Sequence, residues 1–395
     1  MALALGLVGA SLSLAASGAP RPQPPAGPGD GERAAAPPAV NLPPGVTAGI
    51  AVYDRQRGEF TEQHDADRQF RSASVVKLLL ALDVLDDLGP GEKVPAADRA
   101  RLEAMLTSSD DRQASHYWAR RGGSQIIQRM VTRLGLTGTA PPPAGYPGYW
   151  GYTALTAADT VRVYRHILDD ASRAVRDLIM DSLHQATRCA ADGYDQGFGI
   201  ASAFEHPRAV KQGWSGFRSG GCTADTPVTP DAAARAADAP SRSGGAGRAA
   251  AEAGGVDLVR EALHTTGTVG ADDRAIVAVF TLHPNGTSYG TAYSRLTRLA
   301  SSLNVPGAQR PPGDWYGTWG SGVRVRADAT TASAIVTKLP AGVDVLVTCQ
   351  QRGKRIEVPP YSSEWWAYLP QYGGYLTNVY VDTPHERLPG VPECG

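Results

Sequence analysis

The chain has 395 residues and a formal net charge of −1, with 38 Lys+Arg against 39 Asp+Glu. This balance excludes the class of strongly basic nucleic-acid-binding proteins, and the length exceeds what one hydrophobic core usually supports, so we expect two domains. Only five of the basic residues are lysines, namely Lys77, Lys93, Lys211, Lys338 and Lys354. Because arginine keeps its proton, a lysine is expected where the amine must act as a base or as a compact point charge.

The chain begins with an uncharged, apolar run over 2–16, followed by a tract rich in Pro, Gly and Ala. The run is shorter than the roughly 20 residues of a membrane span, so we expect no stable span. It is typical of a signal peptide, which we place at 1–19, before a Pro/Ala-rich linker at 20–42. The alternative is a disordered alanine-rich tail. The signal predicts a secreted, extracellular protein, with cell-wall association left open.

The next segment predicts an α/β domain over 43–304. A β-rich run at 46–53 and a polar turn at 54–58 indicate the first strand of a hairpin. An apolar stretch with helical periodicity at 74–88, ended by Gly89-Pro90-Gly91, indicates a buried helix. We expect the first strand to join the last strands in one sheet. Further helices are predicted at 96–107, 110–120, 124–134, 157–168, 172–184 and 293–303, and further strands at 209–214, 258–268 and 274–283.

Two segments interrupt this pattern. A loop at 137–153 contains no carboxylate, and a stretch at 223–254 with almost no bulky apolar residue predicts a flexible insertion. A linker at 305–315 then leads to a small all-β barrel at 316–395. The strands of this barrel are expected near 323–325, 343–347, 365–369 and 375–381.

The chain has four cysteines, an even number that agrees with an oxidising destination. Three pairings are possible, and the natural choice joins Cys189 to Cys222 and Cys349 to Cys394, one pair within each domain. No CxxC motif or Cys/His cluster is present, so we expect no metal site and no cofactor.

Ser74 and Lys77 stand three residues apart at the start of the buried helix. Residues at this spacing share a helical face, so the amine can reach the hydroxyl. A serine nucleophile needs a neighbouring base, and a desolvated lysine near other cations can serve. The alternative is an N-cap serine followed by an exposed lysine.

Two further segments complete an ordered set of motifs. Ser109-Asp110-Asp111 stands at a junction between loop and helix, and Lys211-Gln212-Gly213 lies in an apolar strand followed by Trp214. Taken singly, the first is explained by a helix N-cap with acidic residues and the second by a lysine at a strand edge. Their common order along the chain favours a functional site.

With these three motifs, the chain resembles the penicillin-recognising serine enzymes, the superfamily of class A β-lactamases and D,D-peptidases, whose signatures are Ser-x-x-Lys, Ser-Asp-Asn and Lys-Thr-Gly. It looks most like actinobacterial members. The resemblance implies a class A β-lactamase-like sheet with helices on both sides. It also implies that Ser74 is acylated, Lys77 is its base, Ser109 relays a proton, and Lys211 attracts a substrate carboxylate. The oxyanion hole would be formed by the N–H groups of Ser74 and Trp214.

The chain departs from the family pattern at three points. Asp111 replaces an asparagine, which favours protonated Lys77 and makes it a poorer base. Gln212 replaces a threonine or serine that would bind the substrate carboxylate, and Ser215 could take over this role. We expect Gln212, Gly213, Trp214 and Ser215 to line the substrate-binding part of the site. Class A enzymes also use a glutamate to activate the deacylating water, and residues 138–158 contain no carboxylate. We therefore expect slow deacylation and poor β-lactamase activity.

The C-terminal segment resembles the Src-homology-3-like domains of secreted bacterial wall proteins at 322–326, 343–349, 365–369 and 378–380. The resemblance implies contact with peptidoglycan. Its aromatic residues either form a binding face or fill the core of a small barrel, and both interpretations stay open. These residues are Trp315, Trp319, Trp365, Trp366, Tyr368, Tyr372 and Tyr375.

The resemblance thus implies a secreted serine hydrolase or acyltransferase that acts on β-lactams or on D-Ala-D-Ala-type wall peptides through an acyl-enzyme. The alternative is a catalytically silent wall-binding or sensor protein with the same fold, favoured by Asp111 and Gln212. A third possibility is an esterase of this superfamily, which Ser109 disfavours because such esterases usually carry tyrosine there.

Overall fold

The computed structural model describes residues 40–86, 88, 92–218, 220, 222, 256–340 and 342–395. Val40–Gly395 form one compact unit. The predicted signal peptide at 1–19, most of the linker at 20–42 and the insertion at 223–254 lie outside the described residues. Wherever the structure describes the chain, no helix has the length and apolar character needed to cross a membrane.

The main sheet has five antiparallel strands in the order β2-β1-β7-β6-β5. As predicted, the first strand pairs with the last strand of this domain, with Ile50 opposite Val279. A sheet of this order brings the two ends of the domain together and leaves β5 at one edge. Its strands are β1 (Thr47–Asp54), β2 (Glu59–His64), β5 (Arg208–Ser215), β6 (Ala262–Val269) and β7 (Ala275–Leu282).

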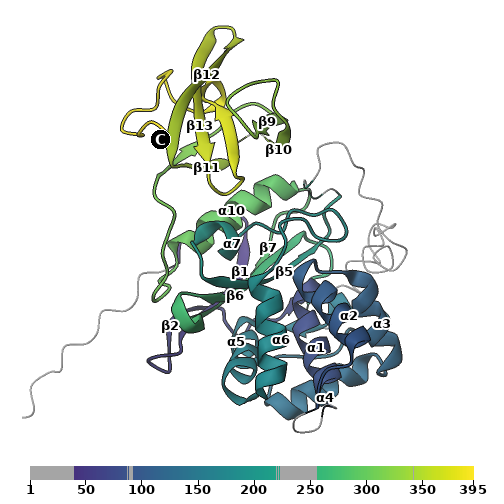
Figure 1. Cartoon of the computed structure of the whole chain (residues 1–395). Coiled ribbons are helices and arrows are strands. Elements are labelled where there is room, and N and C mark those ends of the chain that lie inside the picture. Colours follow the sequence, from purple (N-terminus) through teal and green to yellow (C-terminus); the bar gives the residue numbers. More distant parts are fainter. Residues whose placement is uncertain are drawn as a thin grey trace, which may run out of the picture. The chain divides into compact units, whose positions relative to one another are not determined.

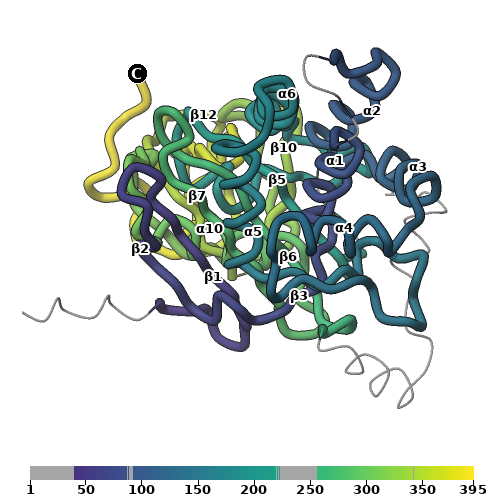
Figure 2. The backbone as a smooth tube through the Cα atoms, turned by 90° about the horizontal axis from the view of Figure 1, so that it is seen from below, coloured from purple at the N-terminus to yellow at the C-terminus, as the bar shows by residue number. Residues whose placement is uncertain are grey.

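Helices cover both faces of the sheet, so the fold is mixed α/β as expected (Figure 1). Helices α1 to α4 gather on the side away from β2 in both views (Figure 1, Figure 2). The helices are α1 (Lys77–Leu85), α2 (Ala96–Thr107), α3 (Asp111–Arg120), α4 (Ser124–Leu134), α5 (Ala157–Arg165), α6 (Arg173–His184), α7 (Ile200–Ala203) and α10 (Tyr289–Ser302). Shorter elements are β3 (Phe70–Arg71), β4 (Ala154–Leu155), the 3-10 turns η1 (Ala73–Val76), η2 (Trp150–Tyr152) and η4 (Ala271–Asp273), and the π-helical turn η3 (His166–Asp170).

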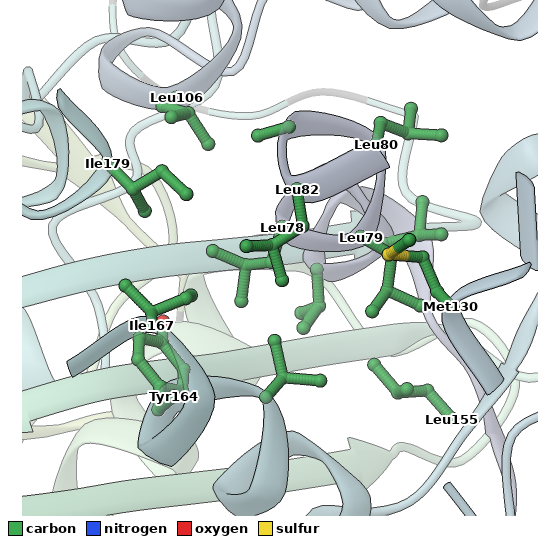
Figure 3. Close-up of a cluster of buried hydrophobic side chains, with 14 of the residues drawn as sticks. Leu78, Leu79, Leu80, Leu82, Leu106, Met130, Leu155, Tyr164, Ile167 and Ile179 are labelled. Atoms are coloured by element: carbon green, nitrogen blue, oxygen red, sulfur yellow. The ribbon is translucent and has the colours of Figure 1, made fainter. Parts of the chain in front are cut away.

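Strand β7 shows why the two faces need separate helical layers. Its side chains alternate, so that Ile276 and Phe280 join one hydrophobic cluster and Val277 and Val279 join the other. The first cluster contains α1 and α5, and the second contains α10. Figure 3 shows Leu78, Leu79, Leu80 and Leu82 of α1 within the first cluster, with Met130, Leu155, Tyr164, Ile167 and Ile179 around them.

The helix predicted at 74–88 starts differently from the prediction. Its first residues form the 3-10 turn η1, and the regular helix α1 begins at Lys77 and ends at Leu85. The reason lies at Ala73, whose φ of +45° cannot be part of a right-handed helix. The chain therefore enters the helix through a sharp turn that contains Ser74.

The C-terminal strands form a five-stranded sheet in the order β10-β9-β14-β13-β12 and a two-stranded sheet β11-β8. In the part of the chain that is described, these pairings do not close the predicted barrel. The strand expected at 375–381 ends at Thr377 and continues as the 3-10 turn η5 (Asn378–Tyr380). The strands are β8 (Asp314–Gly317), β9 (Val323–Arg326), β10 (Ile335–Leu339), β11 (Asp344–Val347), β12 (Cys349–Val358), β13 (Tyr361–Leu369) and β14 (Gly374–Thr377).

The C-terminal aromatic residues divide between core and surface. Trp365, Trp366 and Tyr372 are buried, and Trp366 Nε1 donates to the Lys354 carbonyl at 2.9 Å. Tyr372 stacks on Tyr293 of α10, with ring centroids 5.3 Å apart. These three rings therefore serve packing. The other four aromatic residues expected for a binding face, Trp315, Trp319, Tyr368 and Tyr375, are partly exposed, and Tyr361 is 55% exposed.

Both predicted disulfides are present. Cys189 is bonded to Cys222, and Cys349 is bonded to Cys394. The first links the segment after α6 to the segment after β5, and the second links the start of β12 to the C-terminus.

Candidate active site

Ser74 lies in a tight turn that neighbouring segments hold from outside. The Ser72 N–H donates to the Thr153 carbonyl at 2.8 Å, and the Val75 N–H donates to the Ser72 carbonyl at 3.1 Å. The left-handed φ of Ala73 costs roughly 1–3 kcal/mol, which the surrounding contacts must offset. Ser74 is 6% exposed. Its hydroxyl is thus fixed at the start of α1 rather than free on the surface.

The Lys77 side chain is fully buried at the centre of the site. Its Nζ lies 2.9 Å from Ser74 Oγ, 3.1 Å from Ser109 Oγ, 2.7 Å from the Ser109 carbonyl and 2.5 Å from Asp111 Oδ1. An ammonium group has three protons. The carbonyl and the carboxylate only accept, so the two hydroxyls share one remaining proton. The Trp150 ring packs 4.9 Å from Nζ and adds a cation–π contact.

Ser109 connects the two lysines of the motifs. Its Oγ lies 3.1 Å from Lys77 Nζ and 3.0 Å from Lys211 Nζ. It has a left-handed φ of +54° and is 2% exposed. Asp110, the next residue, caps α3 by accepting from the Arg112 N–H. The N-cap interpretation of this segment is therefore correct for Asp110, while Ser109 faces the lysines.

Lys211 reaches the site from strand β5. It is 1% exposed, and its Nζ contacts Ser109 Oγ and the Gln212 carbonyl at 2.9 Å. Burial, together with the nearby charge of Lys77, holds the pKa of Lys211 well below its usual range, although the carboxylates of Asp111 and Asp192 oppose this effect. Lys211 does lie on an edge strand of the sheet, but its amine is inside the protein rather than in solvent.

The residues after Lys211 take different directions. Gly213 lies so close to η1 that a Cβ there would meet the Ser72 carbonyl oxygen at 3.1 Å and the Ala73 Cβ at 3.3 Å. The Gln212 amide donates instead to the carbonyls of Gln196 and Phe198, at 3.0 and 2.7 Å. The Gln212 Nε2 is thereby occupied by main-chain partners, whereas its Oε1 is buried and has no hydrogen-bond partner among the described residues.

Trp214 and Ser215 end this strand beside other parts of the site. The Trp214 indole N–H donates to Asp192 Oδ2 at 3.0 Å, and its ring stacks on Tyr194. The Ser215 carbonyl accepts from the buried guanidinium of Arg71, which lies just before the Ser74 turn. These contacts fix the end of β5 against the segment that carries Ser74.

Sequence reasoning missed Asp192, which lies in the loop after α6. This carboxyl accepts from the Tyr194 N–H as well as from Trp214. Burial and the nearby charge of Asp111 raise the pKa of Asp192 to about 6, against the opposing effect of Lys77. The loop is fixed by the Cys189–Cys222 disulfide and by the Ala191 N–H, which donates to the Ser108 carbonyl at 2.8 Å. The only sequence signal was the position of Asp192 three residues after Cys189.

Sequence reasoning also missed Trp150. It belongs to the loop at 137–153, where a class A enzyme would supply a glutamate and this chain has no carboxylate. Its indole N–H donates to Ser115 Oγ at 3.2 Å while its ring covers Lys77. The start of this loop is anchored by the buried carboxylate of Asp159, which accepts from the N–H of Gly138 and the hydroxyl of Thr139. The loop thus contributes an aromatic wall to the site.

Across the described ranges, no group of three or more His, Cys, Asp or Glu side chains is arranged to hold a metal ion. Among the described residues, Lys77 contacts Ser74, and Asp111, Lys211 and Asp192 lie close enough to Lys77 to interact with its charge.

No known protein-family profile matches the chain. It is similar to the protein named "Putative lipoprotein LppW" of Mycobacterium bovis and of Mycobacterium tuberculosis, with 36% identity over 175 residues, or 43% of this chain and 54% of the relative. The chain thus spans about half the length of the curated relatives it matches. Among solved structures, it is similar to a class A β-lactamase from Mycobacterium abscessus, with 15% identity, a TM-score of 0.44 and coverage of 65% of this chain and 92% of that one. It is also similar to PBP-A, with 16% identity, a TM-score of 0.43 and coverage of 66% and 89%.

Proposed function

We propose that this chain is a serine acyltransferase or hydrolase that forms an acyl-enzyme on Ser74 and acts on β-lactams or on D-Ala-D-Ala-type wall peptides. One observation carries the proposal: Ser74, Lys77, Ser109 and Lys211 form an unbroken series of contacts of 2.9 to 3.1 Å between hydroxyl and amine groups, all inside the protein. A purely structural role does not explain two buried amines in one site, because burying an amine costs free energy and, among the described residues, only Lys77 has a paired carboxylate, that of Asp111.

The proposed acylation step uses these groups in sequence. Ser74 Oγ attacks the carbonyl carbon of the substrate, and its proton leaves through the amine of Lys77. The N–H groups of Ser74 and Trp214 would hold the developing oxyanion, which the close approach of Gly213 to the Ser74 turn makes feasible. The bond between carbon and the leaving nitrogen then breaks, and the nitrogen takes a proton from Ser109. The product is an ester on Ser74.

Deacylation is expected to be slow. The loop at 137–153 offers the indole of Trp150 at Lys77 and no carboxylate that could activate a water molecule. An acyl group would therefore persist until an amine or a slowly activated water takes it. This favours transfer, or long-lived acylation, over rapid β-lactam hydrolysis.

A second candidate function is a catalytically silent wall-binding or sensor protein. The ion pair between Lys77 and Asp111 favours it, because a paired ammonium is a poor proton acceptor. The two candidates differ in one measurable property, which is covalent reaction at Ser74.

Labelling with a fluorescent penicillin tests the choice. The wild-type protein is expected to retain fluorescence through denaturing electrophoresis, and Ser74→Ala is expected to lose it. Ser72→Ala is the matched control, since its hydroxyl lies in the same turn and bonds only to main-chain carbonyls among the described partners. Folded wild-type protein that takes no label would favour the silent candidate.

We also propose an extracellular or cell-envelope location, supported by the two disulfides and by the name of the similar mycobacterial protein, which describes a lipoprotein. The Src-homology-3-like character of 316–395 and its contact with peptidoglycan remain part of this proposal. Cosedimentation of the full chain with purified peptidoglycan, with and without a Trp319→Ala substitution at a partly exposed ring, tests the wall contact.

A further inference from the structure

The two buried lysines of the site differ in their surroundings. Lys77 has a carboxylate, Asp111, at 2.5 Å. In the described part of the chain, no carboxylate oxygen lies within 4.0 Å of Lys211 Nζ, the distance limit for an ion pair. The hydrogen-bond partners of Lys211 are the Ser109 hydroxyl and the Gln212 carbonyl. A buried ammonium without a paired anion is costly, and a lysine avoids this cost by losing a proton.

The partners of Lys211 match the neutral amine. An amine with two protons and one lone pair can donate to the Gln212 carbonyl and accept from the Ser109 hydroxyl. Two protons of the Lys77 ammonium are donated to the Asp111 carboxylate and to the Ser109 carbonyl, and Ser109 Oγ can then accept the third. In this arrangement Lys77 donates to Ser109 Oγ, and the Ser109 hydroxyl donates to Lys211 Nζ.

We infer that Lys211, rather than Lys77, is the proton acceptor of this site, and that it acts through Ser109. The inference rests on the proposed function and changes its assignment of the base. Lys77 keeps a fixed positive charge and passes protons on. A neutral Lys211 would not offer a permanent positive charge to a substrate carboxylate, which is the role that the family resemblance implies for it.

The proton transfers balance. Because an ammonium has no lone pair, Lys77 Nζ first gives one proton to Ser109 Oγ while the Ser109 proton moves to Lys211 Nζ. The neutral Lys77 amine then takes the proton of Ser74 as Ser74 Oγ forms its bond to the carbonyl carbon. Lys77 stays an ammonium and Lys211 becomes one. When the bond from carbon to the leaving nitrogen breaks, Ser109 gives that nitrogen a proton and recovers one from Lys211. The site returns to its starting charge.

The charged groups around Lys211 agree with this assignment. Lys77 on α1 disfavours a second charge, whereas Asp111 on α3 and Asp192 in the loop after α6 favour it. On the β6 side, Thr266 donates to the Lys211 carbonyl and contacts the hydroxyl of Tyr164, whose pKa burial raises, so that Tyr164 adds no charge. Burial is the largest influence, and it holds the pKa of Lys211 well below its usual range.

Nuclear magnetic resonance of the full chain with 13Cε-labelled lysine reads both charges directly. Only five signals are expected, and the exposed Lys93, Lys338 and Lys354 provide internal references. Lys77→Arg and Lys211→Arg assign the two buried signals. We expect the Lys211 signal to be that of a neutral amine at pH 8 while the Lys77 signal is that of an ammonium. The reverse pattern, or two ammonium signals at pH 8, would overturn the inference. This readout does not require any acylation.

A kinetic arm separates this inference from the proposed function. Wild-type labelling by penicillin tests the function itself. Lys211→Arg keeps the positive charge but cannot accept a proton, so we expect acylation to fall by about 100-fold or more. Acylation within a few-fold of wild type, with the folded state verified by melting, would show that Lys211 supplies only charge.

Discussion

The carboxylate of Asp111 lies 2.5 Å from the ammonium of Lys77, within a site where the second lysine, Lys211, has no ion pair among the described residues. The family that the chain resembles has an asparagine at this position. On our inference, this added negative charge decides which of the two amines carries a proton. The predictions below follow from this charge arrangement and from the packing that supports it.

Asp111→Asn removes the partner of the buried Lys77 ammonium. We expect the free energy of unfolding at pH 7 to fall by about 1–3 kcal/mol, since a buried charge loses its counter-ion but can lose its proton instead. We also expect the pH dependence of the penicillin-labelling rate to differ between Asp111→Asn and wild type, because Lys77 can act as a base once its carboxylate partner is removed. Urea unfolding and the profile of labelling rate against pH measure both effects. Asp67→Asn, at an exposed position, is the control, and equal effects of the two substitutions would contradict the role of the ion pair.

Asp192→Asn tests the carboxyl that the sequence motifs did not include. Burial raises the pKa of Asp192 from 3.8 to about 6, so the folded protein binds this proton more tightly than the unfolded chain does. The contribution of Asp192 to stability is therefore fully present below pH 3.8 and is lost as the pH rises to about 6. Asparagine keeps an acceptor for the Trp214 indole and carries no charge.

We expect Asp192→Asn to be more stable than wild type by about 1–3 kcal/mol at pH 7.5 and to lose this advantage at pH 4. Urea unfolding at both pH values measures the difference. A difference that is the same at both pH values would show that charge is not the cause.

Gly213→Ala tests the close contact between β5 and the Ser74 turn. The new Cβ would lie 3.1 Å from the Ser72 carbonyl oxygen, so the turn must shift. We expect a loss of about 1–3 kcal/mol in stability and a fall in penicillin labelling of roughly 10-fold or more. Gly145→Ala is the matched control, because no atom lies within 4 Å of a Cβ there. Labelling of Gly213→Ala at the wild-type rate would mean that this contact does not position Ser74.

His264 makes the fold sensitive to acid. Its Nδ1 accepts from the Thr281 N–H and its Nε2 contacts the Arg71 carbonyl, an arrangement that requires the neutral ring. Burial lowers the pKa of His264 to about 3. The unfolded chain therefore binds the proton of His264 more tightly than the folded protein does. The contribution of neutral His264 to stability is fully present above pH 6.5 and is lost as the pH falls toward 3.

We expect the free energy of unfolding to fall below pH 6.5 with a contribution from His264 of up to about 1.4 kcal/mol per pH unit. Buried His283 adds to the loss in the same direction. His264→Gln is expected to flatten this dependence in urea unfolding experiments, whereas His385→Gln, at an exposed position, is expected to leave it unchanged. An unchanged slope in His264→Gln would assign the acid sensitivity to other groups.

The sequence was sufficient for the elements whose pattern is local. The helices at 96–107 and 124–134 and the strand at 274–283 were predicted to within a residue or so, because their apolar periodicity or capping signals are contained within them. The pairing of the first strand with the last followed from the order of the elements. The left-handed Ala73 could not be predicted, because contacts with Thr153 and Gly213, both distant in the chain, hold this turn.

The site residues divide in the same way. Ser74, Lys77, Ser109 and Lys211 belong to spaced motifs, so their meeting could be anticipated. Asp192 and Trp150 could not be identified, since each reaches the site from a loop whose path depends on distant anchors, the Cys189–Cys222 disulfide for one and Asp159 for the other. The direction of the Gln212 amide also depends on distant carbonyls, at Gln196 and Phe198.

The central claim is that Ser74 forms a covalent acyl-enzyme. Intact-mass measurement of the full chain after incubation with benzylpenicillin, and separately with a D-Ala-D-Ala peptide, tests it most directly over a time course. We predict that wild-type protein gains the mass of one benzylpenicillin, that this mass decays slowly, and that Ser74→Ala gains none. Folded wild-type protein with no added mass from either compound, or Ser74→Ala with the same adduct as wild type, would contradict the claim.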